Sequence, residues 1–328
     1  MKVKYLKFGN TGLEVSKLCL GCMGFGEPGR GREEWSLNEE ESRKIIKRAL
    51  ELGINFFDTA NYYSLGSSEE ILGKALKDFA KREEVVIASK LYFPMHDGPN
   101  SKGLSRKSIM TEIDNTLRRL QTDYLDLYII HRWDYNTPIE ETMEALNDLV
   151  KSGKVRYIGA SSMHSWQFVK ANYIAEKNGW AKFVSMQNLY NLVYREEERE
   201  MIPLLKDQKI AMTPWSPLAQ GRLTRDLDIV TERSKQESLS IGQEKYAIDA
   251  DNEVIKRCHE LAEKKGISRG QVAMAWVLSK DYVTSPLIGS TKVKYLEDAI
   301  EALNVTLTEE EISYLESPYV PHKIVGFK

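Results

Sequence analysis

The sequence predicts an α/β protein, and within that class a closed (β/α)8 barrel of the TIM type. Short apolar runs alternate with amphipathic stretches along the chain, and eight such runs can be counted. No Pro- or Ser-rich linker separates them. We therefore expect a single barrel domain over residues 1–328, with an N-terminal β-hairpin, extra helices and a long loop after the seventh strand.

Each predicted strand is a short run of apolar or β-branched residues. The runs cover residues 18–22, 55–58, 85–89, 124–130, 155–161, 183–187, 210–213 and 284–288. Amphipathic helices are expected between them, for example over 42–52, 69–77, 105–120 and 139–151. Extra helices are expected over 269–279 and 309–315, and residues 216–250 predict a long loop.

The start of the chain alternates in polarity and turns at residues 9–12, which predicts a β-hairpin. A signal peptide would instead show a continuous apolar stretch. No run approaches the roughly 18 apolar residues that span a bilayer. Three cysteines in 328 residues cannot form a disulfide framework, which favours a reducing compartment. We expect a cytoplasmic protein without a membrane partner.

The formal net charge of −2 gives no basic field that would favour nucleic acid as a partner. The charge does not indicate an oligomeric state. Cys19 and Cys22 form a C-x-x-C pattern, but they lie in a predicted strand and no second ligand pair is near, so no metal or redox site is expected. The acidic run at residues 196–200 is interpreted as a solvated helix start.

Three polar residues stand at the ends of successive predicted strands. Asp58 ends FFD, Lys90 follows VVIAS, and His131 follows DLYII, while Tyr63 lies five residues after Asp58. The carboxyl ends of parallel strands are where barrels and open α/β sheets place their chemistry. Together these four side chains form a set able to donate a proton to a carbonyl oxygen.

The expected roles follow from charge. An ammonium about 4 Å from a phenol contributes roughly 4 kcal/mol at an effective dielectric near 20, before desolvation is subtracted. Lys90 would thereby make Tyr63 more acidic, and Asp58 would hold Lys90 charged. His131 would hydrogen-bond the substrate oxygen or relay the proton.

In these segments the sequence resembles the aldo-keto reductase superfamily. The resemblance runs through GCMGFG, FFDTANYYS, IASKL, LDLYIIHRWD, RYIGASS, QNLYN, PWSPLAQGRLTR and IGSTKVKYLEDA, in that order. It implies an NADPH-binding barrel whose catalytic four are Asp58, Tyr63, Lys90 and His131. Tyr62 is the alternative proton donor, and the family spacing after Asp58 selects Tyr63.

The resemblance also implies a set of residues that contact the cofactor. They are Gly21, Cys22, Met23, Asp58, Ser161, Ser162, Gln187, Trp215, Ser216, Pro217, Leu218, Gly221, Arg222, Arg225, Gly289, Ser290, Thr291, Lys292, Tyr295 and Asp298. Ser162 stands where Asn is common, and Tyr295 stands where the family has a cation. A helix start with a hydroxyl and the Lys292 ammonium favours NADP(H) over NAD(H).

The resemblance predicts an oxidoreductase that reduces aldehydes or ketones to alcohols with NADPH, its partner being a small carbonyl substrate. Loops at the carboxyl face nominate Met23, Phe25, Tyr92 and Trp133 as an apolar substrate lining. Two alternatives stay open. One is a cofactor-binding regulatory subunit with little turnover, as in potassium-channel β subunits, and the other is a barrel enzyme that forms a Schiff base on Lys90.

One motif is set aside. Residues 24–29, GFGEPG, fit the dinucleotide fingerprint G-x-G-x-x-G letter for letter. That fingerprint requires a helix to open at the glycines, whereas Pro28 and the GRGREEW segment predict a loop.

Overall fold

The structure is a computed structural model that describes residues 3–31, 35–226, 229 and 249–327. Most of the long loop predicted over residues 216–250 lies outside these ranges. The described residues 216–226 contain only the short 3-10 helix η4 (Ala219–Gly221), so this part of the prediction is confirmed.

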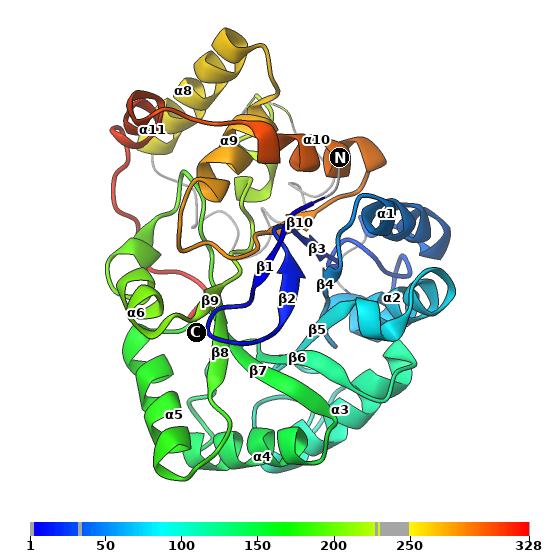
Figure 1. Ribbon diagram of the computed structural model, residues 1–328. Coiled ribbons are helices and arrows are strands. Elements are labelled where there is room, and N and C mark those ends of the chain that lie inside the picture. Colours follow the sequence, from blue (N-terminus) through cyan, green and yellow to red (C-terminus); the bar gives the residue numbers. More distant parts are fainter. Residues whose placement is uncertain (1–2, 32–34, 227–228, 230–248, 328) are drawn as a thin grey trace.

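Within the described residues, eight parallel strands form the predicted barrel (Figure 1). The strands are β3 (Cys19–Gly21), β4 (Phe56–Asp58), β5 (Val86–Leu91), β6 (Leu125–Ile130), β7 (Val155–Ser161), β8 (Phe183–Gln187), β9 (Ala211–Met212) and β10 (Leu287–Gly289). They pair in chain order, and β10 returns to pair with β3. Closure comes from backbone hydrogen bonds of 2.9 Å from Thr284 to Met212 and from Leu287 to Pro214. The predicted fold class is confirmed.

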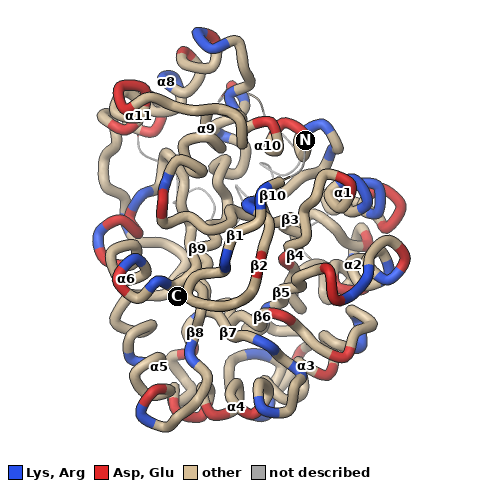
Figure 2. The backbone as a smooth tube through the Cα atoms, in the orientation of Figure 1, with Lys and Arg blue, Asp and Glu red and all other residues tan. Residues whose placement is uncertain are grey.

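Most of the helices form the outer ring of the barrel (Figure 1). Those described are α1 (Glu39–Glu51), α2 (Ser67–Phe79), α3 (Arg106–Leu120), α4 (Ile139–Lys151), α5 (Ser165–Lys177), α6 (Met201–Gln208), α8 (Asp249–Lys265), α9 (Arg269–Leu278), α10 (Val293–Glu301) and α11 (Glu309–Glu316). Lysines, arginines and acidic residues are interspersed along them (Figure 2). Among the described helices none combines the length and apolarity that crossing a bilayer requires.

The predicted N-terminal hairpin is present as β1 (Tyr5–Lys7) paired antiparallel with β2 (Glu14–Ser16). It lies across the centre of the ring in Figure 1. Phe8, fully buried, packs edge-on against Phe56 inside the barrel with ring centroids 5.7 Å apart. The hairpin therefore covers the amino-terminal end of the strands, and the carboxyl ends are left for chemistry.

Some helices and strands begin or end at other residues than predicted, because a capping side chain or pairing with a neighbouring strand sets the limit. α1 begins three residues before its predicted start because the Asn38 side chain accepts a hydrogen bond from the amide of Glu41 and caps the helix. β5 runs past Lys90 because Lys90 and Leu91 still pair with β6. Lys90 thus lies inside the strand rather than after it.

The helices predicted over residues 269–279 and 309–315 are present as α9 and α11. α9 packs against α10 in the ring, and α8 lies outside the ring against α11 (Figure 1). α9 suits the inner position because every residue from Gln271 to Val277 is buried. The interpretation of the acidic run as solvated is wrong for its first part, since Glu196 and Glu197 are buried, whereas Arg199 and Glu200 are exposed. Glu196 accepts hydrogen bonds from the Tyr319 hydroxyl (2.6 Å) and the His322 amide (2.7 Å) of the C-terminal segment.

Candidate active site

The site is built around the buried ammonium of Lys90 on β5. Its Nζ lies 2.5 Å from Oδ1 of Asp58, the last residue of β4, and 2.8 Å from the carbonyl oxygen of Thr59. The same Nζ lies 3.2 Å from the hydroxyl oxygen of Tyr63. Lys90 is fully buried and Asp58 is 1% exposed. The structure thus brings together three of the four predicted catalytic residues by direct contact.

Charge and burial oppose each other on this cluster. Burial by itself would lower the pKa of Lys90, but Asp58 and Tyr63 together raise that pKa above its ordinary value. Burial is also the largest effect on Tyr63 and raises the pKa of its phenol, while Lys90 opposes that rise. The net direction is upward, which corrects the expectation of an acidified phenol. Lys90 therefore stays positively charged, and the Tyr63 hydroxyl stays protonated.

His131 follows β6 directly and completes the predicted four. Its ring is nearly perpendicular to that of Tyr63, with centroids 5.8 Å apart. Burial, followed by the charges of Lys90 and Arg132, lowers the pKa of His131 well below its ordinary value. The imidazole is therefore neutral at pH 7, and it can hydrogen-bond a substrate oxygen but carries no ready proton for relay.

Gln187, the last residue of β8, is tied to the same cluster across the barrel. Its amide donates a 2.8 Å hydrogen bond to Oδ2 of Asp58, and its backbone oxygen accepts one from Ser161. Asp58 therefore has one oxygen on Lys90 and the other on Gln187, which fixes the carboxylate from two sides.

Tyr63 is held by an unusual turn. It begins the 3-10 helix η1 (Tyr63–Gly66), in which Ser64 and Leu65 adopt left-handed backbone angles with φ of 44° and 46°. The turn is braced by Gly26: a Cβ built there would lie 2.1 Å from the Ser64 hydroxyl oxygen. The GFGEPG segment thus serves as a close-packed loop without a helix, as the sequence predicts.

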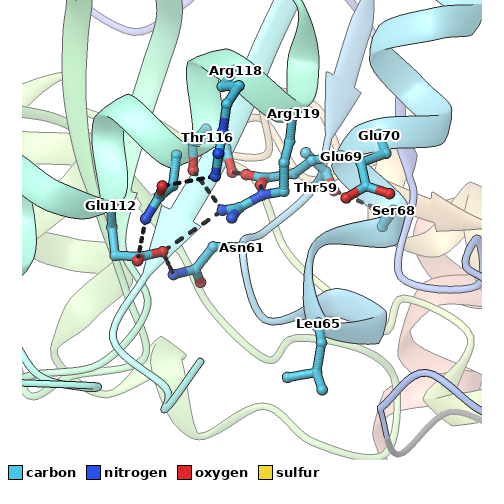
Figure 3. A network of polar contacts seen from close by, with 12 residues as sticks. Thr59, Asn61, Leu65, Ser68, Glu69, Glu70, Glu112, Thr116, Arg118 and Arg119 are labelled. Carbon is cyan, nitrogen blue, oxygen red and sulfur yellow. Dashed lines mark hydrogen bonds and ion pairs between the residues drawn. The ribbon is translucent and has the colours of Figure 1, made fainter. Parts of the chain in front are cut away.

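A network of polar contacts beside this turn contains buried charged residues that were not predicted from the sequence (Figure 3). The fully buried Glu69 pairs with Nε of Arg119 at 2.5 Å and accepts a hydrogen bond from Ser89. Glu112 holds both Arg119, at 3.6 Å, and the Asn61 amide, at 2.8 Å. The network therefore links α2 and α3 to the segment just before Tyr63. Glu69 lies in the first turn of α2, where a buried Glu is not distinguishable in sequence from a surface Glu.

The residues predicted to contact the cofactor's nicotinamide end lie at the carboxyl ends of β7 to β9. The Trp215 indole N–H donates to the Ser162 hydroxyl at 3.2 Å, and the Ser161 and Ser162 hydroxyls are 3.3 Å apart. Ser162 and Ser216 have positive φ angles of 49° and 56°. Pro217 is buried, and Leu218 is partly exposed beside it.

Residues predicted to contact phosphates lie on two segments. After Ser216, residues Ala219, Gln220 and Gly221 all have positive φ. Their backbone amides donate within the turn, to the Ser216 carbonyl (2.9 Å), the Ser216 hydroxyl (3.0 Å) and the Leu218 carbonyl (2.9 Å) respectively. A Cβ on Gly221 would lie 2.6 Å from Nη1 of Arg225, so that guanidinium covers the turn. Arg222 is partly exposed at the end of the same turn.

The second segment runs from β10 into α10. Gly289, Thr291 and Lys292 are exposed, whereas Ser290 is buried and its hydroxyl bonds to the Lys292 carbonyl at 2.6 Å. Tyr295 is exposed with the Lys292 ammonium 5.7 Å from its ring centroid, and Asp298 is partly exposed further along α10. Gly21 ends β3, which pairs with β10, and Gly24 approaches Thr291.

The predicted substrate lining divides in two. Met23 and Tyr92 are partly exposed, whereas Phe25 and Trp133 are buried in the core and offer little surface. Cys22, predicted to contact the cofactor, is likewise fully buried. Phe93 was not predicted from the sequence, yet its ring lies 4.9 Å from His131, 5.1 Å from Tyr62 and 5.3 Å from Tyr92. A single Phe after a strand does not indicate, in the sequence, that its ring contacts three other rings of the site.

The fold and the site define a (β/α)8-barrel protein with a buried lysine in contact with a tyrosine hydroxyl at the carboxyl ends of its strands. Comparison with known proteins identifies the family. The profile of the aldo/keto reductase family matches residues 17–319, and the chain belongs to that family. Aldo/keto reductases use nicotinamide cofactors, and the Ser161 and Ser162 hydroxyls and the exposed Lys292 fit such a group.

Similar proteins carry consistent names. The chain is 46% identical to the versiconal hemiacetal acetate reductase of Aspergillus parasiticus, over 98% of both chains. It is 46% identical to a putative aryl-alcohol dehydrogenase of Schizosaccharomyces pombe, over 97% of this chain and 96% of the relative. An aldo-keto reductase of Metarhizium robertsii is 42% identical, over 99% and 93%. The family and these relatives support an oxidoreductase.

Proposed function

We propose that this protein is an NADPH-dependent reductase that converts aldehydes and ketones to alcohols, with Tyr63 as the general acid. The observation that carries the proposal is the 3.2 Å contact between the Tyr63 hydroxyl and the Lys90 ammonium, itself fixed by Asp58. NADPH, when bound, supplies the hydride. The chain supplies the proton and the groups that orient the carbonyl.

The order of events in the protein follows from its charges. The substrate oxygen is placed between the Tyr63 hydroxyl and the neutral imidazole of His131. As negative charge develops on that oxygen, Tyr63 gives up its proton, and Lys90 stabilises the phenolate that remains. Gln187 and Asp58 keep Lys90 in place, so that little reorganisation accompanies the transfer.

The cofactor would be held by the segments that follow β7 to β10. Ser161, Ser162 and Trp215 would hold its nicotinamide end, and the turn at 216–221 would hold its pyrophosphate. NADP is proposed over NAD because Thr291 and Lys292 stand exposed at the start of α10, where a hydroxyl, an ammonium and helix amides suit a phosphate. The three free cysteines agree with a cytoplasmic location.

Aromatic carbonyl compounds are the proposed substrate class. Tyr62, Tyr92 and Phe93 form a ring cluster that reaches His131. Aromatic rings pack well on such a cluster, and three relatives are named as putative aryl-alcohol dehydrogenases.

NADPH oxidation with benzaldehyde tests the proposal. Tyr63→Phe should lower kcat by about 10²- to 10⁴-fold because general acid catalysis contributes that much. Tyr62→Phe is the matched comparison, since it removes the neighbouring phenol. A larger loss in Tyr62→Phe than in Tyr63→Phe would transfer the role to Tyr62. NADPH binding without turnover of any carbonyl would instead favour a regulatory subunit.

The Schiff-base alternative finds no support in the geometry. A lysine must be neutral to attack a carbonyl carbon. Lys90 is paired with Asp58 at 2.5 Å, and its raised pKa keeps the amine protonated. Borohydride trapping of a carbonyl compound on Lys90 is the measurement that would reopen this alternative.

A further inference from the structure

Arg132, the residue after His131, places a guanidinium beside the reacting groups. Its carbon lies 5.5 Å from the ring centroid of Phe93, the ring that also contacts His131. On its other side lies the C-terminal segment, since a Cβ built on Gly326 would be 4.0 Å from Nη2 of Arg132. The guanidinium thus stands between the aromatic cluster and the end of the described chain.

The Arg132 guanidinium makes few hydrogen bonds to the described part of the protein. A guanidinium has five N–H donors. Over the described part of the chain, Arg132 makes one hydrogen bond, 2.5 Å from Nη1 to the backbone oxygen of His131. The nearby Asp134 does not pair with it. That carboxylate accepts from Leu104, Asn136 and Thr137 instead.

The electrostatic surroundings of Arg132 lack an acidic partner as well. Burial lowers its pKa, and the groups that oppose burial are the phenols of Tyr63 and Tyr92, not a carboxylate. Two other partly buried arginines have carboxylate partners: Arg119 is paired with Glu69, and Arg195 with Glu198. A desolvated guanidinium without an anion is costly, so an anion supplied by a ligand would bind there favourably.

We propose that Arg132 is a specificity-determining residue that binds a carboxylate on the substrate, so that the preferred substrates are aromatic aldehydes or ketones bearing an acidic group. This inference rests on the proposed function and deepens it. The planar fork of the guanidinium suits a carboxylate. The Phe93 ring lies near both Arg132 (5.5 Å) and His131 (4.9 Å), so an aromatic substrate stacked on it could direct its carbonyl toward His131 and Tyr63 and its acid toward Arg132.

The test compares ortho-, meta- and para-carboxybenzaldehyde with their neutral amides, which have nearly the same shape. For at least one isomer, kcat/KM of the unaltered protein should favour the acid by about 10- to 100-fold, the size of a charge-assisted hydrogen bond. Arg132→Met should bring that ratio near one, and Arg132→Lys should retain part of it because the charge remains.

Arg156→Met is the matched control. Arg156 also donates to a backbone oxygen, that of Gly153, and lies over an aromatic ring, that of Tyr124, but it stands near the amino end of β7. Its loss should leave the acid-to-amide ratio unchanged. An unaltered protein without preference for any acid isomer, or an unchanged ratio in Arg132→Met, would overturn the inference.

Calorimetry separates this inference from the proposed function. If no aldehyde is reduced, the proposed function fails, and binding of carboxybenzyl alcohol in the presence of NADP+ then decides the role of Arg132. Binding that weakens about 10-fold or more in Arg132→Met supports the inference. Equal binding in both proteins, or none in the unaltered protein, contradicts it.

Discussion

The ammonium of Lys90 lies 3.2 Å from the hydroxyl oxygen of Tyr63, yet the pKa of that phenol is raised. Burial outweighs the nearby cation, so Tyr63 retains its proton well into alkaline solution. The role of Lys90 is therefore to limit the cost of losing the proton during the reaction. It does not ionise the phenol beforehand.

Replacing Lys90 by methionine should lower kcat by about 10²-fold or more, because the phenolate left after proton transfer loses its cation. Reduction needs a protonated Tyr63 and is lost as pH rises through its pKa. Without Lys90 that pKa rises further, so the alkaline limb of the kcat profile should move to higher pH. A limb at the same pH in both proteins would show that Lys90 does not act on Tyr63.

Two companion variants make this experiment interpretable. Lys90→Arg keeps a cation and should shift the alkaline limb less. Lys90→Met alone leaves the buried Asp58 carboxylate unpaired, which destabilises folds by about 3 to 5 kcal/mol. Asp58→Asn combined with Lys90→Met removes both charges, so it should unfold at higher urea concentration than Lys90→Met alone while keeping the kinetic defect.

Gly26→Ala should lower kcat although Gly26 touches no reacting atom. The added Cβ would lie 2.1 Å from the hydroxyl oxygen and 2.4 Å from the Cβ of Ser64, so the turn that holds Tyr63 must move. A displacement of about 1 Å can cost roughly 10²-fold in rate. Ser64→Gly should restore activity in the double variant, since glycine removes the clash and accepts the positive φ.

Gly12→Ala serves as the control for that substitution, because a Cβ at Gly12 meets nothing within 4 Å. Its kcat should match that of the unaltered protein. If Gly26→Ala leaves kcat unchanged, the loop around Gly26 moves to make room for the added methyl group and the turn that holds Tyr63 does not.

The sequence predicts well those features that depend on residues close together in the chain. Strands β7 and β8 have the predicted limits because their apolar runs end at residues that leave the sheet. Asp58, Lys90 and His131 could be placed together because parallel strands bring their carboxyl ends to one edge. Phe93, Glu69 and Arg132 could not be found in this way. Their importance depends on neighbours far along the chain, and their residue types occur as often on surfaces.

Arg119→Met should destabilise the protein by about 3 to 5 kcal/mol, because it leaves the fully buried Glu69 carboxylate without its cation. Urea unfolding measures the loss. Lys154→Met breaks an exposed pair of the same 2.5 Å length with Asp114 and should cost under about 1 kcal/mol. Similar losses in the two variants would show that the Glu69 site is hydrated.

Glu197→Gln should stabilise the protein in alkaline solution. Glu197 is 4% exposed, and burial raises the pKa of its carboxyl from 4.5 to about 8. The folded chain therefore holds a proton that the unfolded chain releases. This contribution to stability is full below the unfolded pKa and falls by about 1.4 kcal/mol per pH unit until the folded pKa is passed.

Glutamine keeps the shape without the charge, so the variant's advantage in free energy of unfolding should grow from near zero at about pH 5 to roughly 2 to 5 kcal/mol at about pH 8. Urea titrations of both proteins at several pH values measure it, with the exposed Glu83→Gln as control. Stabilities that stay parallel across this range would mean that Glu197 is ionised in the folded protein and paired with a donor strong enough to offset its burial.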